Sequence, residues 1–282
     1  MYLWAMKDFP IVLSIAGSDP SGGAGIQADI KAISACGGYA AAAVTAVTVQ
    51  NTQGVSSVEY LSGELVAAQV DSVMSDLAVD AVKIGMTGTV PIVEAIASQL
   101  EAHPVLYVVT DPVMVSTSKD ALTLPEAVEA LSGKVFPHSH LITPNIDEAS
   151  KLAGFRIRSI EDMERAAALL RDRYRCAVLV KGGDLPATGT AASDSTAIVS
   201  ESTDVLCDID GLVHITSERV LTNNLHGTGC TLSSAIATFL GAGHPLREAV
   251  QCAVAYVHNA IVAAASLRIG HGHGPLRHFY NV

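Results

Sequence analysis

The chain has 282 residues, of which 49% are hydrophobic, 16% are charged and only 5% are aromatic. This composition supports a large core of closely packed helices around a parallel sheet and disfavours an all-β barrel. The formal net charge of −11 argues against nucleic acid or an anionic membrane as the main partner.

A strand, a glycine loop and a helix form the first predicted unit. An apolar run covers Phe9 to Ala16, glycines crowd residues 17–25, and helical spacing continues from Ile26 to Ala35. The loop matches neither the Gly-Lys-Ser/Thr phosphate loop nor the dinucleotide fingerprint, so it is not predicted to bind nucleotide phosphates. It would still let a small ligand lie against the backbone. Asp29 either reaches that space or is a solvated acid near the helix start.

Two later strands are predicted to end in polar side chains. A strand over Tyr39 to Val49 leads to Gln50, and a strand over Val105 to Thr110 leads to Asp111. Open α/β sheets bind ligands at the carboxyl ends of their strands, so Gln50 is a candidate ligand residue. Asp111 binds a metal, orients a substrate or caps a turn. The segments predicted between these strands are a helix at Glu64 to Leu77, a strand at Ala81 to Ile84 and a helix at Pro91 to Leu100.

Another strand-to-helix junction follows a helix predicted at about Pro125 to Leu131. Pro144 ends a short strand, and Asn145 begins a helix that carries Glu148 on the same face. Asn145 and Glu148 could hold Mg²⁺ through water beside a nucleotide phosphate. They also fit a capping box, and the residues alone favour the capping box.

The following segment contains a candidate anion ligand and a candidate lid. A helix at Ile160 to Tyr174 precedes a strand at Ala177 to Lys181, where Lys181 can meet an anion. Residues Leu185 to Asp204 have little apolar content, which is typical of a mobile loop or lid. Weak alternation over Asp204 to Thr216 predicts one or two antiparallel strands at the sheet edge.

Asn224 to Ser234 is predicted to be a turn that leads directly into a helix N-terminus. The unpaired amides of Gly227, Thr228 and Gly229 would suit a phosphate or the charge of a migrating phosphoryl group. Cys230 would lie in the first helical turn, where its thiol pKa is expected to fall. The alternative is a glycine turn whose cysteine only packs.

A long apolar helix at Leu246 to Ala265 and a polar tail complete the chain. Polar residues interrupt the helix, so it is not expected to span a membrane. The tail histidines are expected to lie in a polar loop rather than in a metal site, because no acidic or cysteine ligand accompanies them. They are His271, His273 and His278.

Alternating strands and helices predict one doubly wound α/β domain over residues 9–282, although length alone would also allow two domains. The polar residues named above would line one edge of its mostly parallel sheet. An anion-binding helix start, a candidate Mg²⁺ position and a lid are the parts of a phosphoryl-transfer site.

Cysteine usage and the N-terminus bear on location. The five cysteines are odd in number, scattered and without a C-x-x-C pair. They predict neither a disulfide framework nor a zinc site, and they fit a reducing cytoplasm. Neither a signal peptide nor a membrane-spanning run is expected.

Seven separated blocks recur in the order found in one known family. The blocks are Ala16-Gly-Ser-Asp-Pro-Ser-Gly-Gly-Ala-Gly-Ile-Gln-Ala-Asp29, Thr45-Ala-Val-Thr-Val-Gln-Asn-Thr52, Lys83-Ile-Gly-Met86, Asp111-Pro-Val-Met114, Thr143-Pro-Asn145, Lys181-Gly-Gly183 and His226-Gly-Thr-Gly-Cys-Thr-Leu-Ser233. With the tail, they make nearly the whole chain resemble the hydroxymethylpyrimidine/phosphomethylpyrimidine kinases of thiamine synthesis. The resemblance implies a ribokinase-like α/β/α sandwich.

The resemblance also implies an activity and a set of site residues. Phosphate would pass from ATP to the hydroxymethyl group of 4-amino-5-hydroxymethyl-2-methylpyrimidine, and again to the monophosphate. The implied pyrimidine contacts are Gly17, Ala24, Asp29, Gln50 and Met86. Cys230 would be the base beside the Gly227, Thr228 and Gly229 turn. Asn145, Thr228 and Lys181 would bind ATP, and Asp111 and Glu148 would bind Mg²⁺, which replaces the capping role favoured for Glu148.

Two departures from the family pattern and several alternatives remain. Lys119 stands where the family usually has glycine, and Asp184 replaces a common histidine. Pyridoxal kinase shares the implied fold, and a non-catalytic vitamin-precursor binder is the alternative from another class. A dinucleotide-dependent dehydrogenase is disfavoured by the absent fingerprint. A homodimer is expected.

Overall fold

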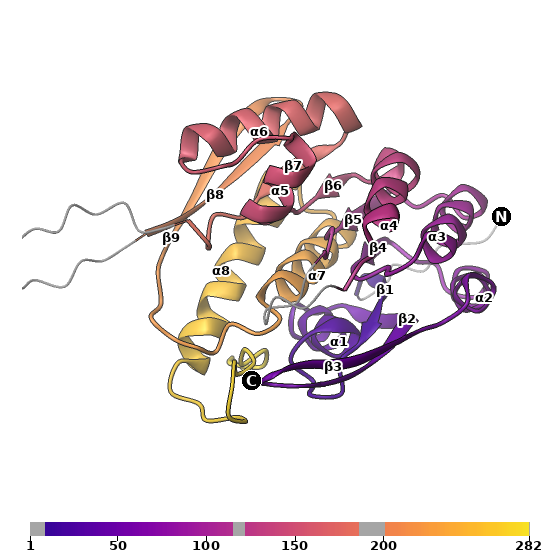
Figure 1. Ribbon diagram of the computed structural model, residues 1–282, viewed down its shortest axis with the longest axis horizontal. Helices are drawn as coiled ribbons and strands as arrows, with labels where there is room; N and C mark the ends of the chain where they lie inside the picture. Colours follow the sequence, from indigo (N-terminus) through magenta and orange to yellow (C-terminus); the bar gives the residue numbers. More distant parts are fainter. Residues whose placement is uncertain (1–8, 115–121, 186–200, 282) are drawn as a thin grey trace, which may run out of the picture.

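One sheet contains all nine strands of the described residues, which are 9–114, 122–185 and 201–281 of the computed structural model (Figure 1). The strand order is β3-β2-β1-β4-β5-β6-β7-β8-β9. The strands are β1 (Ile11–Ser18), β2 (Tyr39–Asn51), β3 (Gly54–Tyr60), β4 (Ala81–Ile84), β5 (Tyr107–Thr110), β6 (Leu141–Ile142), β7 (Ala177–Val180), β8 (Glu201–Asp208) and β9 (Gly211–Glu218).

The sheet is parallel from β2 to β7, which confirms the predicted mostly parallel sheet. Both edges are antiparallel. The edge of β8 and β9 was expected, whereas the edge strand β3 was not. Glu201–Asp204 belong to β8 and not to a loop, because they pair with Thr216–Glu218 and Ile215 of β9.

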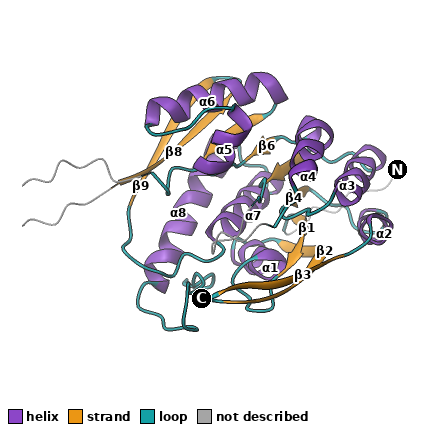
Figure 2. Ribbon diagram, viewed as in Figure 1, coloured by secondary structure: helices purple, strands orange, loops and turns teal. Residues whose placement is uncertain are grey.

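Helices cover both faces of the sheet (Figure 2). They are α1 (Gly25–Ala35), α2 (Gly63–Met74), α3 (Val90–Ala102), α4 (Pro125–Ala130), α5 (Ile146–Ala153), α6 (Ile160–Tyr174), α7 (Thr228–Gly241) and α8 (Leu246–Ala264). A π-helical turn at Leu131–Val135 and a 3₁₀ turn at Phe136–His138 follow α4.

Two separate cores result from the alternation of side chains along the buried strands. Leu13 and Ile15 of β1 pack with α2 to α6 on one face. Val12, the residue before Leu13, packs with α1, α7 and α8 on the other. The α/β sandwich therefore holds the ends of its central strands, and the helices that begin there, in fixed positions.

Two predictions fall wholly or largely outside the described residues: the departure at Lys119 and the lid at Leu185 to Asp204, of which 186–200 are not described. Among the residues that are described, no helix is long and apolar enough to cross a membrane.

Candidate active site

The turn before α7 is built on Gly227. Its φ of 82° lies in the left-handed region that favours glycine. A Cβ atom there would also overlap the carbonyl oxygen of Gly23, so the turn lies directly against the glycine loop after β1. The predicted turn into a helix N-terminus is therefore present, and segments about 200 residues apart in sequence meet at it.

The amides of this turn differ from the expected set. The Thr228 N–H donates to the carbonyl of Leu225 at 3.2 Å, and the Thr231 N–H donates to the carbonyl of Gly227 at 2.9 Å. Gly229 and Cys230 lie between them, in the first helical turn, where N–H groups have no intrahelical acceptor. The anion-binding donors are thus better assigned to Gly229 and Cys230 than to Thr228.

Asp19 and His226 lock the two glycine segments together. The Asp19 carboxylate accepts hydrogen bonds from the N–H groups of Ser21, Gly23 and Ala24, and it lies 2.9 Å from Nε2 of His226. Burial opposes its ionisation, but the hydrogen bonds from His226, Ser21 and Ala24 outweigh burial and lower the pKa of Asp19 to about 2. Sequence reasoning missed this residue, although an Asp before Pro20 in a glycine loop is typical of a side chain that organises a turn.

Asp29 is fully buried, so neither expectation for it holds. Both of its oxygens lie 2.8 Å from Nζ of Lys83, and the hydroxyls of Ser14 and Ser234 donate to it at 2.6 and 2.8 Å. Both side chains of this ion pair are 0% exposed. Asp29 is therefore a core anion rather than a pyrimidine contact or a solvated acid, and Lys83 is a site residue that sequence reasoning missed.

Cys230, at the start of α7, interacts electrostatically with both members of this buried pair. Burial raises the pKa of the Cys230 thiol to about 11, while the nearby Lys83 ammonium and the Gly25 N–H act in the opposite direction. The expected fall in the Cys230 pKa is wrong for the free protein, because desolvation outweighs the helix start and the lysine.

A lysine and a carboxylate meet the same helix start from the opposite side. Nζ of Lys181 lies 2.7 Å from Oδ1 of Asp111, which also accepts a hydrogen bond from Thr143 at 3.1 Å. A Cβ atom on Gly229 would lie 3.2 Å from both Asp111 and Lys181. Asp111, Lys181 and the α7 turn, predicted separately, thus converge on one point.

Asn145 and Glu148 form the capping box that the residues alone favoured. The Asn145 side chain accepts from the Glu148 N–H at 2.9 Å, and the Glu148 carboxylate accepts from the Asn145 N–H at 2.8 Å. Glu148 also accepts from the Met114 N–H at 3.3 Å. The capping role that the residues alone favoured is therefore confirmed, while the metal role implied by the resemblance stays a prediction, because a carboxylate that caps a helix can still hold a metal through water.

The charges around Lys181 leave room for a cation. Three carboxylates lie around it: the buried Asp111 and Glu148 and the half-buried Asp204, the last of which accepts the Gly182 N–H at 2.8 Å. Burial, with repulsion from Asp111, raises the pKa of Glu148 to about 7, and burial raises that of Asp204 to about 6. Since one ammonium cannot neutralise three carboxylates, the donor set fits a Mg²⁺ ion that arrives with phosphate and keeps several waters.

We expect these raised pKa values to make the protein less stable as the pH rises from 4.5 to 7. Glu148 holds its proton more tightly in the folded than in the unfolded chain, so folding takes up a proton in this range. The free energy of unfolding should fall by up to roughly 3 kcal/mol from this group. Glu148→Gln, which cannot ionise, should flatten that dependence in urea denaturation without Mg²⁺. The exposed Asp147→Asn is the matched control, and equal slopes in wild type and Glu148→Gln would contradict the assignment.

The remaining predicted pyrimidine contacts gather beside the glycine loop. A Cβ atom on Gly17 would lie 2.9 Å from Sδ of Met86, so these two residues are in contact. The Met86 carbonyl accepts the Thr45 hydroxyl at 2.6 Å. A Cβ atom on Gly227 would lie 3.2 Å from Cα of Ala24, so Ala24 lies against the turn before α7. Together they place small or apolar surface next to the start of α7.

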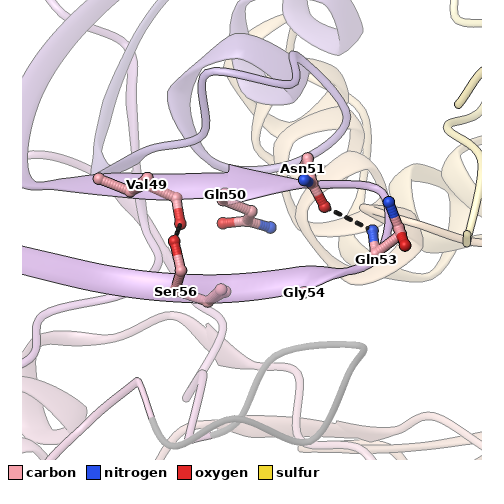
Figure 3. A pocket seen from close by; sticks show the side chains of 7 residues that line it. Val49, Gln50, Asn51, Gln53, Gly54 and Ser56 are labelled. Carbon is pink, nitrogen blue, oxygen red and sulfur yellow. Dashed lines mark hydrogen bonds between the residues drawn. The ribbon is translucent and has the colours of Figure 1, made fainter.

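Gln50 lies within β2 rather than beyond its end, because β2 continues into a hairpin with β3. Its side chain is one of those that line the β2–β3 hairpin in Figure 3, and it accepts the Thr48 hydroxyl at 3.2 Å. Its Nε2 lies 3.4 Å from Nε2 of His226. It lines a hollow of about 450 Å³ with Val49, Asn51, Gln53, Gly54, Val55 and Ser56. Gln50 is thus a polar group that links the hairpin to His226 in the turn before α7.

The C-terminal tail packs on the turn instead of forming only a polar loop. The His226 N–H donates to the carbonyl of Gly274 at 3.0 Å. His278 is buried, with Nε2 3.0 Å from the Thr231 hydroxyl, and burial lowers its pKa to about 4. The tail therefore packs against the first turn of α7.

A doubly wound sheet whose central strands and helix starts bring a glycine turn, a cysteine and a lysine–carboxylate cluster together defines a ribokinase-like small-molecule kinase. A family model described as phosphomethylpyrimidine kinase matches residues 19–277. The chain belongs to this phosphomethylpyrimidine kinase family.

Three relatives illustrate the match. A hydroxymethylpyrimidine/phosphomethylpyrimidine kinase of Rhizobium meliloti is 49% identical over 96% of this chain and 97% of its own. The crystal structure of phosphomethylpyrimidine kinase from Clostridium difficile 630 is 38% identical, with a TM-score of 0.75 over 89% of this chain and 99% of that one. Pyridoxal kinase from Staphylococcus aureus, in complex with AMP-PCP and pyridoxal, is 32% identical, with a TM-score of 0.83 over 98% and 95%.

Proposed function

We propose that this kinase transfers phosphate from ATP to the hydroxymethyl group of 4-amino-5-hydroxymethyl-2-methylpyrimidine, and then to the monophosphate, in thiamine synthesis. Full-length similarity to kinases named for these acceptors supports the substrate. The observation that carries the chemistry is the contact of Gly229 with both Asp111 and Lys181, which brings an anion-binding helix start and a charged cluster to one point.

The helix start would hold the charge of the transferring phosphoryl group. The amides of Gly229 and Cys230 and the positive end of the α7 dipole are fixed in place before the reaction, so they stabilise charge without reorganising. Lys181 adds a fixed positive charge next to them. Asp111 and Glu148 would hold Mg²⁺ through water, and the ion would supply positive charge against the negative charge that develops on the phosphate. Asn145, at the cap of α5, would lie on the ATP side with Thr228.

The acceptor alcohol must lose its proton as the new O–P bond forms. Cys230 is the group we assign to receive that proton, in its thiolate form. Lys83, the fully buried ammonium beneath it, favours ionisation of the thiol. The Lys83 and Asp29 pair therefore acts on the reaction through Cys230 and not through the substrate.

Gln50 is proposed to recognise the pyrimidine edge. Its amide offers a donor and an acceptor together, which match the ring nitrogen and exocyclic amine of an aminopyrimidine. Gln50→Ala should lower kcat/KM for the pyrimidine about tenfold or more, since an unpaired buried polar group costs ~1 to 3 kcal/mol. Gln53→Ala, in the same hairpin, is the matched control. An unchanged kcat/KM in Gln50→Ala would remove Gln50 from the site.

Pyridoxal kinase is the second candidate, favoured by the TM-score of 0.83 to the Staphylococcus aureus enzyme. Formation of ADP should be measured with the aminopyrimidine, with pyridoxal and without an acceptor. We expect the highest kcat/KM with the aminopyrimidine and little turnover without an acceptor. A higher kcat/KM with pyridoxal would favour the second candidate, and absence of turnover with every acceptor would favour a non-catalytic binder.

We also propose a single kinase domain, a homodimer and a cytoplasmic location. A single sheet through the described residues supports one domain. The exposed apolar side chains Tyr39, Val47 and Val49 on β2 suit contact with a second copy. Free thiols at all five cysteines fit a reducing compartment.

A further inference from the structure

Three metal-ligating side chains converge where α8 begins, at the opposite end of α7 from Cys230. The ligand atoms of His244, Glu248 and Cys252 all lie within 4.8 Å of one another. His244 precedes the helix, while Glu248 and Cys252 are four residues apart and share one face of it. Nδ1 of His244 lies 2.9 Å from Oε1 of Glu248.

The donors of this cluster are held in position before any ligand arrives. The His244 ring packs edge-to-face on Phe239, with centroids 5.6 Å apart, and the backbone N–H of His244 donates to the Phe239 carbonyl at 3.1 Å. Cys252 carries a free, partly exposed thiol on a rigid helix. An ion can therefore reach the cluster from solvent, and binding would restrict few side-chain rotamers that are not already restricted.

Nearby charges favour a cation at this position. Arg247 is held by two hydrogen bonds of 2.7 Å to Asp208 on β8, so its charge is already balanced. The side chain of Glu248 is 55% exposed and supplies the negative charge.

We propose that His244, Glu248 and Cys252 form a Zn²⁺ site with a fourth position for water. Nitrogen, carboxylate oxygen and thiolate sulfur are the donors that zinc takes, whereas Mg²⁺ and Ca²⁺ take oxygen ligands. The ion would tie the α7–α8 turn to the second turn of α8. Since α7 spans 14 residues, this site is about 20 Å from the catalytic turn and acts on stability rather than on phosphoryl transfer. The spacing of the cysteines did not predict a zinc site, because only one cysteine takes part and His244 and Glu248 supply the other ligands.

Titration of the metal-free protein with Co²⁺ tests the proposal. The wild type should bind one ion with the strong visible absorption of a tetrahedral site and a thiolate-to-cobalt charge-transfer band, and Zn²⁺ should displace it. Cys252→Ser should lose the charge-transfer band, and His244→Ala should weaken binding at least tenfold. Zn²⁺ should raise the Tm of the wild type but not of these variants.

Two controls separate this site from other ligands. His103→Ala removes another histidine–carboxylate pair, in which His103 lies 2.8 Å from Asp71 but no cysteine is included. Cys230→Ala removes the thiol assigned to catalysis. Both should bind Co²⁺ as the wild type does. A wild type without the charge-transfer band, or a band that persists in Cys252→Ser, would overturn the proposal. If Cys252→Ser fails to fold, the loss of Co²⁺ affinity in His244→Ala tests the site instead, because the His244 side chain is partly exposed and its removal leaves the core intact.

Discussion

Replacing Cys230 with alanine should lower kcat for pyrimidine phosphorylation by about 10² to 10⁴, the usual contribution of general-base assistance. The KM for ATP should change little, because the thiol is assigned to the acceptor alcohol. Cys36→Ala, which removes a thiol at the far end of α1, is the matched control. A folded Cys230→Ala enzyme with near-normal kcat would show that Cys230 only packs in the fold. Catalysis would then depend mainly on the amides at the start of α7.

The pH dependence of kcat in the same variant tests whether the Cys230 thiolate accepts the proton. Burial raises the pKa of Cys230 to about 11, so the thiolate fraction is small at pH 7 and increases about tenfold per pH unit below that pKa. The kcat of the wild type should therefore rise from pH 7 to pH 9, and that of Cys230→Ala should not. Parallel profiles in the two enzymes would contradict a role for the thiolate.

Replacing Lys83 with methionine should lower the free energy of unfolding by about 3 to 5 kcal/mol. The change leaves the Asp29 carboxylate buried with only the hydroxyls of Ser14 and Ser234 as partners. Urea denaturation measures the loss. The matched control is Lys134→Met, whose ion pair with Glu94 is 2.7 Å long but has both side chains 51% exposed, and it should cost less than about 1 kcal/mol.

The double variant Asp29→Asn/Lys83→Met separates the two causes of that loss. Removing both charges leaves no uncompensated ion, so most of the stability should return. Lys83→Met should also raise the pH at which kcat increases, because its ammonium favours the Cys230 thiolate. A loss for Lys83→Met as small as for Lys134→Met, or losses that simply add in the double variant, would contradict the buried pair.

Local patterns predicted the elements that carry their own periodicity. The ranges of β4 and α6 agree with the apolar spacing, because each is bounded by polar or turn residues. β3 was missed because Gly54–Tyr60 alternates only weakly and becomes a strand by pairing with β2. The π-helical turn after α4 has no sequence signature that differs from that of an α-helix.

Some residues of the candidate site could likewise be predicted from local sequence, and others could not. Residues at strand ends and helix starts, such as Asp111 and Lys181, could be predicted because topology brings them to one edge. The Lys83 and Asp29 pair could not, since it depends on the register that places Ser14 opposite Lys83 and on the packing of α1 over both strands. The pKa of Cys230 was predicted with the wrong sign, because depth of burial is a property of the fold.

Product analysis with ATP, Mg²⁺ and 4-amino-5-hydroxymethyl-2-methylpyrimidine tests the central claim most directly. Mass spectrometry should show the pyrimidine monophosphate first and the diphosphate later, with one ADP formed per phosphate transferred. Cys230→Ala should give the same products more slowly. Consumption of ATP without any phosphorylated pyrimidine, or phosphorylation of pyridoxal alone, would contradict the account.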